Sequence, residues 1–216
     1  MDVLYADSDL IAVNKPAGLV TTPDDQNIDA VITRLRSQFA ELYAVHRLDK
    51  DTTGVVLFAR NRDAHAVLNS QFEARIVIKT YHMVIAGRPW WRAQTIDAAL
   101  RDDADQKHRT LADNRAGKPA RTTFSVVSQF EHFALIEAVP HSGRTHQIRA
   151  HLAIMGANIV EDRLYAELVR VTQPSTSIRR MALHALTISF NHPSTGVKTN
   201  ITAPYAADFA ALLVGR

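Results

Sequence analysis

A short apolar run at residues 55–59, VVLFA, constrains the fold of this chain more than any other stretch. The run is too short for a buried helix and includes two β-branched valines, so it predicts a strand that is buried on both faces. Asn61 follows it as a candidate helix N-cap. Apolar residues then recur at helical spacing: Ala64, Val67, Leu68 and Phe72. A doubly buried strand that leads into an amphipathic helix requires a substantial core.

Further strands are predicted where short apolar or alternating runs are bounded by turn residues. They fall at residues 3–6, 10–13, 80–86, 122–127, 133–139 and 183–190, and hairpins join the first pair and the pair within 122–139. Apolar periodicity predicts helices within residues 29–39 and 143–155, the second ended by Gly156. Residues 101–118 are polar and unperiodic, which predicts a long exposed loop.

Together these elements predict an α+β fold with a mixed, largely antiparallel sheet and flanking helices. The chain contains no internal repeat and no Pro/Gly/Ser-rich linker, so we expect a single domain over residues 1–216. A hydrophobic content of 46% and a net charge of only +3 exclude a disordered chain.

A polar segment directly before the buried run is the first candidate for chemistry. Asp49 lies there with Thr52, Thr53 and Gly54, so its carboxylate is expected on a loop whose tip faces a cleft. Asp, Thr and Gly are also ordinary turn residues. Composition alone favours the plain turn.

Two further residues have positions that suit a buried site. Arg149 lies about 90° from Ile148, the centre of the apolar stripe of its predicted helix, at the margin of the buried face. Its guanidinium there reaches either an internal carboxylate or water. Arg144 lies near the start of the same helix, where anions are favoured. Tyr81 shares a strand face with Met83, which predicts a half-buried phenol; a core tyrosine is the plain alternative.

Several classes of function are excluded. The chain has no cysteine, and three histidines spaced by five residues cannot converge on one ion from a helix: His141, His146 and His151. We therefore expect no metal site. The glycines are isolated, so no phosphate-binding loop for ATP or a dinucleotide is present, and no Gly-x-Ser-x-Gly elbow indicates a serine hydrolase. No apolar stretch is long enough to span a membrane, and the N-terminus does not resemble a signal peptide.

Basic residues are concentrated after Asp49. Residues 1–50 hold 5 Lys/Arg against 8 Asp/Glu, whereas residues 51–150 hold 14 against 10. Most of these cations are arginines, whose planar guanidinium matches phosphate oxygens. A mildly basic surface with no ligand explains the same counts, and from composition alone it is the favoured explanation.

Four segments resemble the motifs of the RluA family of RNA pseudouridine synthases. They are residues 14–19 (NKPAGL), 46–54 (HRLDKDTTG), 79–81 (KTY) and 142–152 (SGRTHQIRAHL), and residues 183–185 and 203–204 echo later features of the family. The segments occur in family order over nearly the whole chain. The resemblance implies the pseudouridine synthase fold with a central active-site cleft, and isomerisation of uridine in RNA with no cofactor.

The same resemblance implies roles for individual residues. Asp49 would be the catalytic nucleophile, and Arg149 would pair with it and hold it ionised. Tyr81 would stack near a flipped-out base and take the proton in the last steps. Arg47 and Arg144 would bind the nucleotide and the RNA backbone. His46 and Thr52 complete the expected substrate-binding set. The expected partner is a stem-loop of ribosomal or transfer RNA, bound by a monomer in the cytoplasm.

The sequence departs from the family pattern at a few positions. Asn158 stands where a Pro is expected, and Glu161 where a Gly is expected. Glu does not adopt positive φ cheaply, so the turn before Asp162 is expected to differ from that of the family. The chain also starts directly in the catalytic region, and we expect no N-terminal accessory RNA-binding domain.

Two other functions remain open from the sequence. An RNA-binding or RNA-folding module without turnover is consistent with the same basic surface, but it would not need Asp49, Tyr81 and Arg149 together. An acid–base hydrolase that uses Asp49 and a histidine has no supporting spacing. The particular RNA and uridine are not specified by the sequence.

Overall fold

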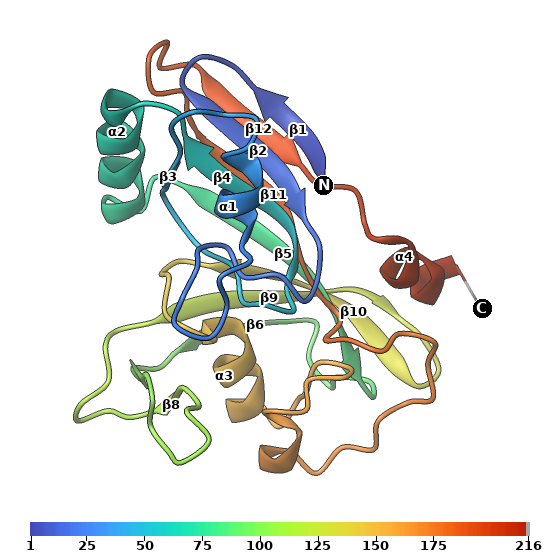
Figure 1. Ribbon diagram of the computed structural model, residues 1–216. Coiled ribbons are helices and arrows are strands. Elements are labelled where there is room, and N and C mark those ends of the chain that lie inside the picture. Colours follow the sequence, from blue (N-terminus) through green and yellow to red (C-terminus); the bar gives the residue numbers. More distant parts are fainter. Residues whose placement is uncertain (215–216) are drawn as a thin grey trace. The chain divides into compact units, whose positions relative to one another are not determined.

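The apolar run at residues 55–59 lies within strand β4, Thr53–Ala59, and every residue of β4 is buried. The structure is a computed structural model that describes residues 1–214 (Figure 1). It divides into two units, one of residues 1–79 and 184–206 and the other of residues 80–183 and 207–214. No helix among residues 1–214 is long and apolar enough to cross a membrane.

The first unit is built on a sheet in which β4 is central. The strand order is β1 (Asp2–Ala6), β2 (Leu10–Lys15), β4 and β11 (Leu183–Asn191). The short β3 (Tyr43–Ala44) pairs with β4, and β12 (Lys198–Thr202) pairs with β11. β11 runs parallel to β4 and the other pairs are antiparallel. Figure 1 shows how this unit combines the blue N-terminal strands with the orange C-terminal ones.

Two helices belong to the first unit, and only one follows its prediction closely. α2 spans Arg62–Glu73, and the side chain of Asn61 caps it by accepting a 2.8 Å hydrogen bond from the Ala64 N–H. Val67 is 41% exposed, so its predicted place on the buried stripe is wrong. α1 covers only Val31–Leu35 of the predicted residues 29–39. It has no side-chain cap, and three of its five residues are β-branched, which lowers helix propensity.

The second unit contains an antiparallel sheet in the order β5 (Ile78–Ala86), β10 (Phe133–Pro140), β9 (Arg121–Gln129) and β6 (Ala93–Asp97). The predicted hairpin within residues 122–139 is confirmed as β9 and β10. α3 spans Gln147–Ile154, α4 spans Ala207–Val214, and a 3-10 turn covers Ala166–Leu168. Antiparallel hairpins, one parallel pair and flanking helices confirm the predicted α+β class. The single domain over 1–216 stays a prediction.

Most of residues 101–118 are exposed, as their polarity predicts, but the segment is not entirely a loop. β7 (Leu100–Arg101) and β8 (Leu111–Ala112) form a two-stranded sheet there, and Thr110 is only 1% exposed. The polar side chains are partnered locally: Asp105 pairs with Arg109 at 2.6 Å, and Asp113 accepts the N–H groups of Arg115 and Ala116. Such local hydrogen bonds order a segment without an apolar period.

Candidate active site

The loop that carries Asp49 is anchored by a buried ammonium. Lys15, at the end of β2, is fully buried, and its Nζ donates to the carbonyl oxygens of Pro16 at 2.9 Å, Leu19 at 2.6 Å and Lys50 at 2.8 Å. An ammonium has three N–H donors, so these three carbonyls match its donor number. Since Lys50 directly follows Asp49, the contact fixes the backbone on one side of the carboxylate.

A hydroxyl fixes the backbone on the other side of Asp49. Thr21 Oγ1 accepts the N–H of Leu48 at 3.0 Å and donates to the Leu48 carbonyl at 3.2 Å. The N–H of Thr52 closes the turn by donating to the Asp49 carbonyl at 3.1 Å. Both neighbours of Asp49 are therefore held, while Asp49 itself stays partly exposed. The plain-turn interpretation is correct for the backbone, and the anchors make that turn rigid.

The start of β4 is packed so closely that only glycine fits. Gly54 has φ +111°, and a Cβ there would lie 2.2 Å from the carbonyl oxygen of Ala185 on β11. The preceding residue, Thr53, is hydrogen-bonded to His184 Nδ1 at 2.9 Å, and His184 Nε2 lies 3.2 Å from the Ala203 carbonyl. A carbonyl oxygen can only accept, so we assign the ring proton of His184 to Nε2. Nδ1 then accepts a hydrogen bond from the Thr53 hydroxyl. The segment after Asp49 is thereby fixed to β11.

His46 is occupied by the protein backbone. Its Nε2 accepts the N–H of Leu57 at 3.0 Å, and its ring stacks on Phe72 with centroids 5.2 Å apart. Desolvation by burial, together with the charge of Lys79, lowers the pKa of His46 to about 3. The ring is therefore neutral at physiological pH and carries its proton on Nδ1. Its expected role in substrate binding stays a prediction.

The other predicted residues of this segment differ in exposure. Arg47 is exposed, whereas Thr52 is only 2% exposed. The expected substrate-binding roles of Arg47 and Thr52 stay predictions.

Tyr81 lies on β5 opposite Ala138 of β10 and is 9% exposed. It is more buried than the half-buried phenol predicted from alternation, because the residues of β5 from Tyr81 to Ala86 are all buried. Tyr81 belongs to the second unit and Asp49 to the first. Their joint action stays a prediction.

Arg149 lies in α3 and binds a carboxylate that the sequence did not identify. Its Nε donates to Asp162 Oδ2 at 2.7 Å and its Nη2 donates to Asp162 Oδ1 at 2.8 Å. The first six residues of α3 are all buried, so the predicted single apolar stripe understates the burial of this helix. The predicted pairing of Arg149 with Asp49, which belongs to the other unit, stays a prediction.

The turn before Asp162 does not avoid the conformation that favours glycine. Glu161 adopts φ +61° in the left-handed region, so the expectation that this turn would change because Glu resists positive φ is wrong. The turn places Asp162 beside Arg149 and keeps the Glu161 side chain near Arg163, with a 3.3 Å contact between Oε2 and Nη2. The buried ion pair outweighs the local strain.

Arg144 precedes α3, which starts at Gln147 rather than at 143. The side chain of Gln147 accepts from the Ser142 hydroxyl at 2.8 Å and from the Arg144 N–H at 3.0 Å, and so replaces the missing helical turn. His146, just before the helix, has a backbone conformation in the left-handed region, with φ +49°. The Arg144 side chain is partly exposed and donates to the Pro119 carbonyl at 3.3 Å.

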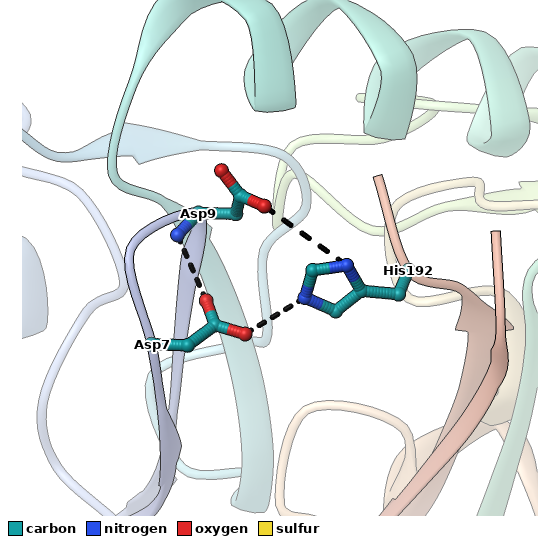
Figure 2. A group of neighbouring side chains, drawn as sticks. All are labelled: Asp7, Asp9 and His192. Atoms are coloured by element: carbon teal, nitrogen blue, oxygen red, sulfur yellow. Dashed lines mark hydrogen bonds and ion pairs between the residues drawn. The ribbon is translucent and has the colours of Figure 1, made fainter. Parts of the chain in front are cut away.

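A side-chain cluster with the residue types of a metal site lies outside these motif segments. Figure 2 shows Asp7 and Asp9 beside His192, whose Nε2 lies 2.7 Å from Asp7 Oδ2. Asp7 also accepts from the Tyr5 hydroxyl and from two backbone N–H groups, and Asp9 accepts from Asn61 and Ser194. Burial opposes ionisation of Asp7, but these hydrogen bonds outweigh it and lower its pKa to about 2. The cluster ties two turns together through protein bonds.

The three histidines considered for a metal have separate partners. His141 is hydrogen-bonded to Thr123 at 3.0 Å and His146 lies 3.4 Å from the Tyr165 hydroxyl. His151 is fully buried, with Thr122 at 2.9 Å and the Ala98 carbonyl at 3.1 Å. Burial lowers the pKa of His151, so it is a neutral core residue.

Sequence comparison links the chain to known enzymes. A family model described as RNA pseudouridylate synthase matches residues 9–154. Dual-specificity RNA pseudouridine synthase RluA from Vibrio vulnificus (strain CMCP6) is 33% identical over 201 residues, which cover 90% of this chain and 79% of that protein. Ribosomal large subunit pseudouridine synthase C from Yersinia pestis is 36% identical over 210 residues, which cover 94% of this chain and 65% of that protein.

Solved structures share the fold. Human RNA Pseudouridylate Synthase Domain Containing 4 matches with a TM-score of 0.80 at 24% identity, over 98% of this chain and 91% of that chain. Human RNA Pseudouridylate Synthase Domain Containing 1 matches with a TM-score of 0.76 at 25% identity, over 94% of this chain and 82% of that chain.

Proposed function

Because this chain belongs to the RluA-type family of RNA pseudouridine synthases and is therefore an isomerase of uridine in RNA, we propose that Asp49, Tyr81 and Arg149 are its catalytic residues. The reaction breaks the bond between the ribose C1′ and N1 of the base, turns the base, and joins C1′ to C5. The C5 proton is released and N1 gains a proton, so atoms balance without an added reagent.

The double anchoring of the Asp49 loop is the observation that best supports this proposal. A carboxylate that reacts with a flipped-out nucleotide must be held in place before the substrate arrives, because misplacement by about 1 Å costs about 100-fold in rate. The side chains of Lys15 and Thr21 hold the residues on either side of Asp49 through hydrogen bonds of 2.8–3.2 Å to their backbone groups. A plain surface turn does not need a fully buried lysine beneath it.

We take the remaining roles from the resemblance of the motif segments to those of the family. Arg149 pairs with the Asp49 carboxylate and aims it, and the Tyr81 ring packs against the target base. Arg47 is exposed and lies near the flipped-out nucleotide, and the partly exposed Arg144 contacts the RNA backbone. His46 and Thr52 belong to the substrate site in this proposal: the His46 ring accepts the Leu57 N–H and Thr52 is buried, so each shapes the loop that receives the nucleotide.

The substrate class in this proposal is a stem-loop of ribosomal or transfer RNA, where an unpaired uridine is easily removed from its stack. It is supported by relatives named for the large ribosomal subunit and for dual specificity. We also propose a cytoplasmic, monomeric enzyme, which light scattering and cell fractionation can check. Mapping pseudouridines in RNA from cells with and without the protein identifies the target.

Release of tritium from RNA containing 5-tritiated uridine tests the catalytic assignment. The intact protein should release label from RNA that lacks the modification. Tyr81→Phe, which keeps the ring and removes the hydroxyl, separates stacking from proton transfer: full activity assigns stacking alone. If the intact protein binds RNA but releases no label above background on any unmodified RNA, the proposal is wrong and an RNA-binding module is the better description.

A further inference from the structure

The guanidinium of Arg149 is held by groups outside the three proposed catalytic residues. Asp162 takes the Nε and Nη2 edge in a two-pronged contact, and both side chains are buried, at 9% and 2% exposure. Such paired contacts fix the plane of the guanidinium as well as its position. A lone buried charge would be costly, so each partner requires the other.

The face of the same guanidinium is covered by an aromatic ring. Tyr165 is 1% exposed, and the Arg149 Cζ lies 4.8 Å from its ring centroid. The Tyr165 hydroxyl accepts the N–H of Thr110 at 2.9 Å and donates to the Thr110 carbonyl at 3.0 Å. The ring therefore cannot move away without breaking two hydrogen bonds to the Thr110 backbone. Burial raises the pKa of Tyr165 to about 12, which keeps the hydroxyl a donor.

The contacts with Asp162 and Tyr165 also orient the rest of the guanidinium. A guanidinium has five N–H groups in a fixed fork. Two are directed at Asp162, and the Tyr165 ring covers one face. The remaining N–H groups, on Nη1 and on the outer side of Nη2, then point in a direction set by Asp162 and Tyr165.

We propose that Asp162 and Tyr165 are positioning residues of the pseudouridine synthase, which fix the direction in which Arg149 presents its remaining donors to the reacting carboxylate. The inference rests on the proposed function, in which Arg149 acts on Asp49. Through Thr110, the β7–β8 segment also takes part in holding Arg149. The left-handed Glu161 is then explained by the place it gives to Asp162.

A double-variant cycle tests whether Asp162 acts through Arg149. Asp162→Asn keeps the shape and removes the charge and one acceptor; Arg149→Lys keeps the charge and removes the fork. We expect each alone to slow single-turnover tritium release about 10- to 100-fold with little change in the dissociation constant for RNA. The double variant should release tritium at no less than about one third of the rate of the slower single variant. The reason is that the free-energy effects of substitutions at interacting residues do not simply add.

Tyr165→Phe covers the case in which Asp162→Asn does not fold. It keeps the ring over Arg149 and removes both bonds to Thr110, and it should slow release by about tenfold in the wild type but not in the Arg149→Lys background. Glu161→Gln is the matched control in the same turn and should keep the wild-type rate. Thermal denaturation of each variant identifies losses due to unfolding.

The outcomes separate the two proposals. An intact protein that releases no tritium contradicts the proposed function itself. If the intact protein is active but the effects of Asp162→Asn or Tyr165→Phe multiply fully with that of Arg149→Lys, Asp162 and Tyr165 stabilise the fold independently of Arg149 and the inference is wrong. Unchanged rates in the single variants also contradict it.

Discussion

The buried ammonium of Lys15 donates a 2.8 Å hydrogen bond to the carbonyl oxygen of Lys50, the residue directly after Asp49. Two residues 35 positions apart are thus joined beneath the proposed nucleophile. The position of Asp49 depends on the first motif segment as well as on its own.

Lys15→Met tests this anchor. Methionine fills a similar volume but leaves three carbonyl oxygens without their donor, so we expect a loss of about 3 kcal/mol in the free energy of unfolding. Because the Asp49 loop also loses an anchor, tritium release should fall in the fraction that stays folded. Urea denaturation and single-turnover assays measure the two effects. Lys50→Met is the matched control: its exposed side chain donates to Asn27 Oδ1, and its removal should cost less than about 1 kcal/mol.

Gly54→Ala should be among the most damaging single-methyl additions in the chain. The new Cβ would overlap the Ala185 carbonyl oxygen at 2.2 Å, and φ +111° is strained for alanine. We expect a cost on the order of 3 kcal/mol or failure to fold.

Gly196→Ala is the control for backbone strain alone. It has φ +69° and no atom within 4 Å of the new Cβ, so it should cost about 1 kcal/mol. Equal costs in chemical denaturation would show that the close approach of Gly54 to Ala185 is unimportant.

Glu161→Gly should stabilise the protein. Glycine adopts φ +61° without steric cost, and the exposed contact with Arg163 that is lost contributes little. We expect a gain of about 1 kcal/mol in the free energy of unfolding, measured by thermal denaturation. Glu161→Ala loses the same contact but keeps the strain, and should give no gain. A destabilised Glu161→Gly variant would contradict the strain argument.

His46 makes the stability of the fold depend on pH. Its folded pKa is lowered from 6.5 to about 3, so the unfolded chain binds the proton more readily. The stabilisation is therefore complete above pH 6.5 and declines as the pH falls from 6.5 toward 3. His46→Asn, which does not titrate, should flatten the dependence of unfolding free energy on pH in this window. Burial also lowers the pKa of His82 and of His151. Both histidines are present in the intact protein and in His46→Asn, so the difference between the two pH curves isolates the contribution of His46. Parallel curves would mean that His46 titrates normally.

The elements whose form is decided by local pattern were predictable from the sequence. A doubly buried strand requires a continuous apolar run, and residues 55–59 provide one; a capped helix requires a side-chain acceptor, and Asn61 provides it. The family motifs identified the candidate residues Asp49, Tyr81 and Arg149, but not what holds them.

Features decided by contacts between distant residues were not predictable. Nothing in the spacing of Arg149 and Asp162 indicates an ion pair, since Asp162 lies beyond the helix and after a turn that Glu161 was expected to change. Lys15 reads as one cation in a loop until the structure shows it fully buried under three carbonyls. Residues 101–118 are ordered by side-chain hydrogen bonds rather than by an apolar face. Their short strands therefore leave no apolar periodicity in the sequence.

Comparison of two neighbouring carboxylates tests the central claim most directly. Asp49→Asn and Asp51→Asn make the same chemical change in the same loop, where Asp51 is exposed. Under single turnover on unmodified RNA containing 5-tritiated uridine, Asp49→Asn should release no label above background while it binds RNA and unfolds like the intact protein. Asp51→Asn should release label at close to the intact rate. Release by folded Asp49→Asn at the intact rate would contradict the assignment of Asp49 as the nucleophile.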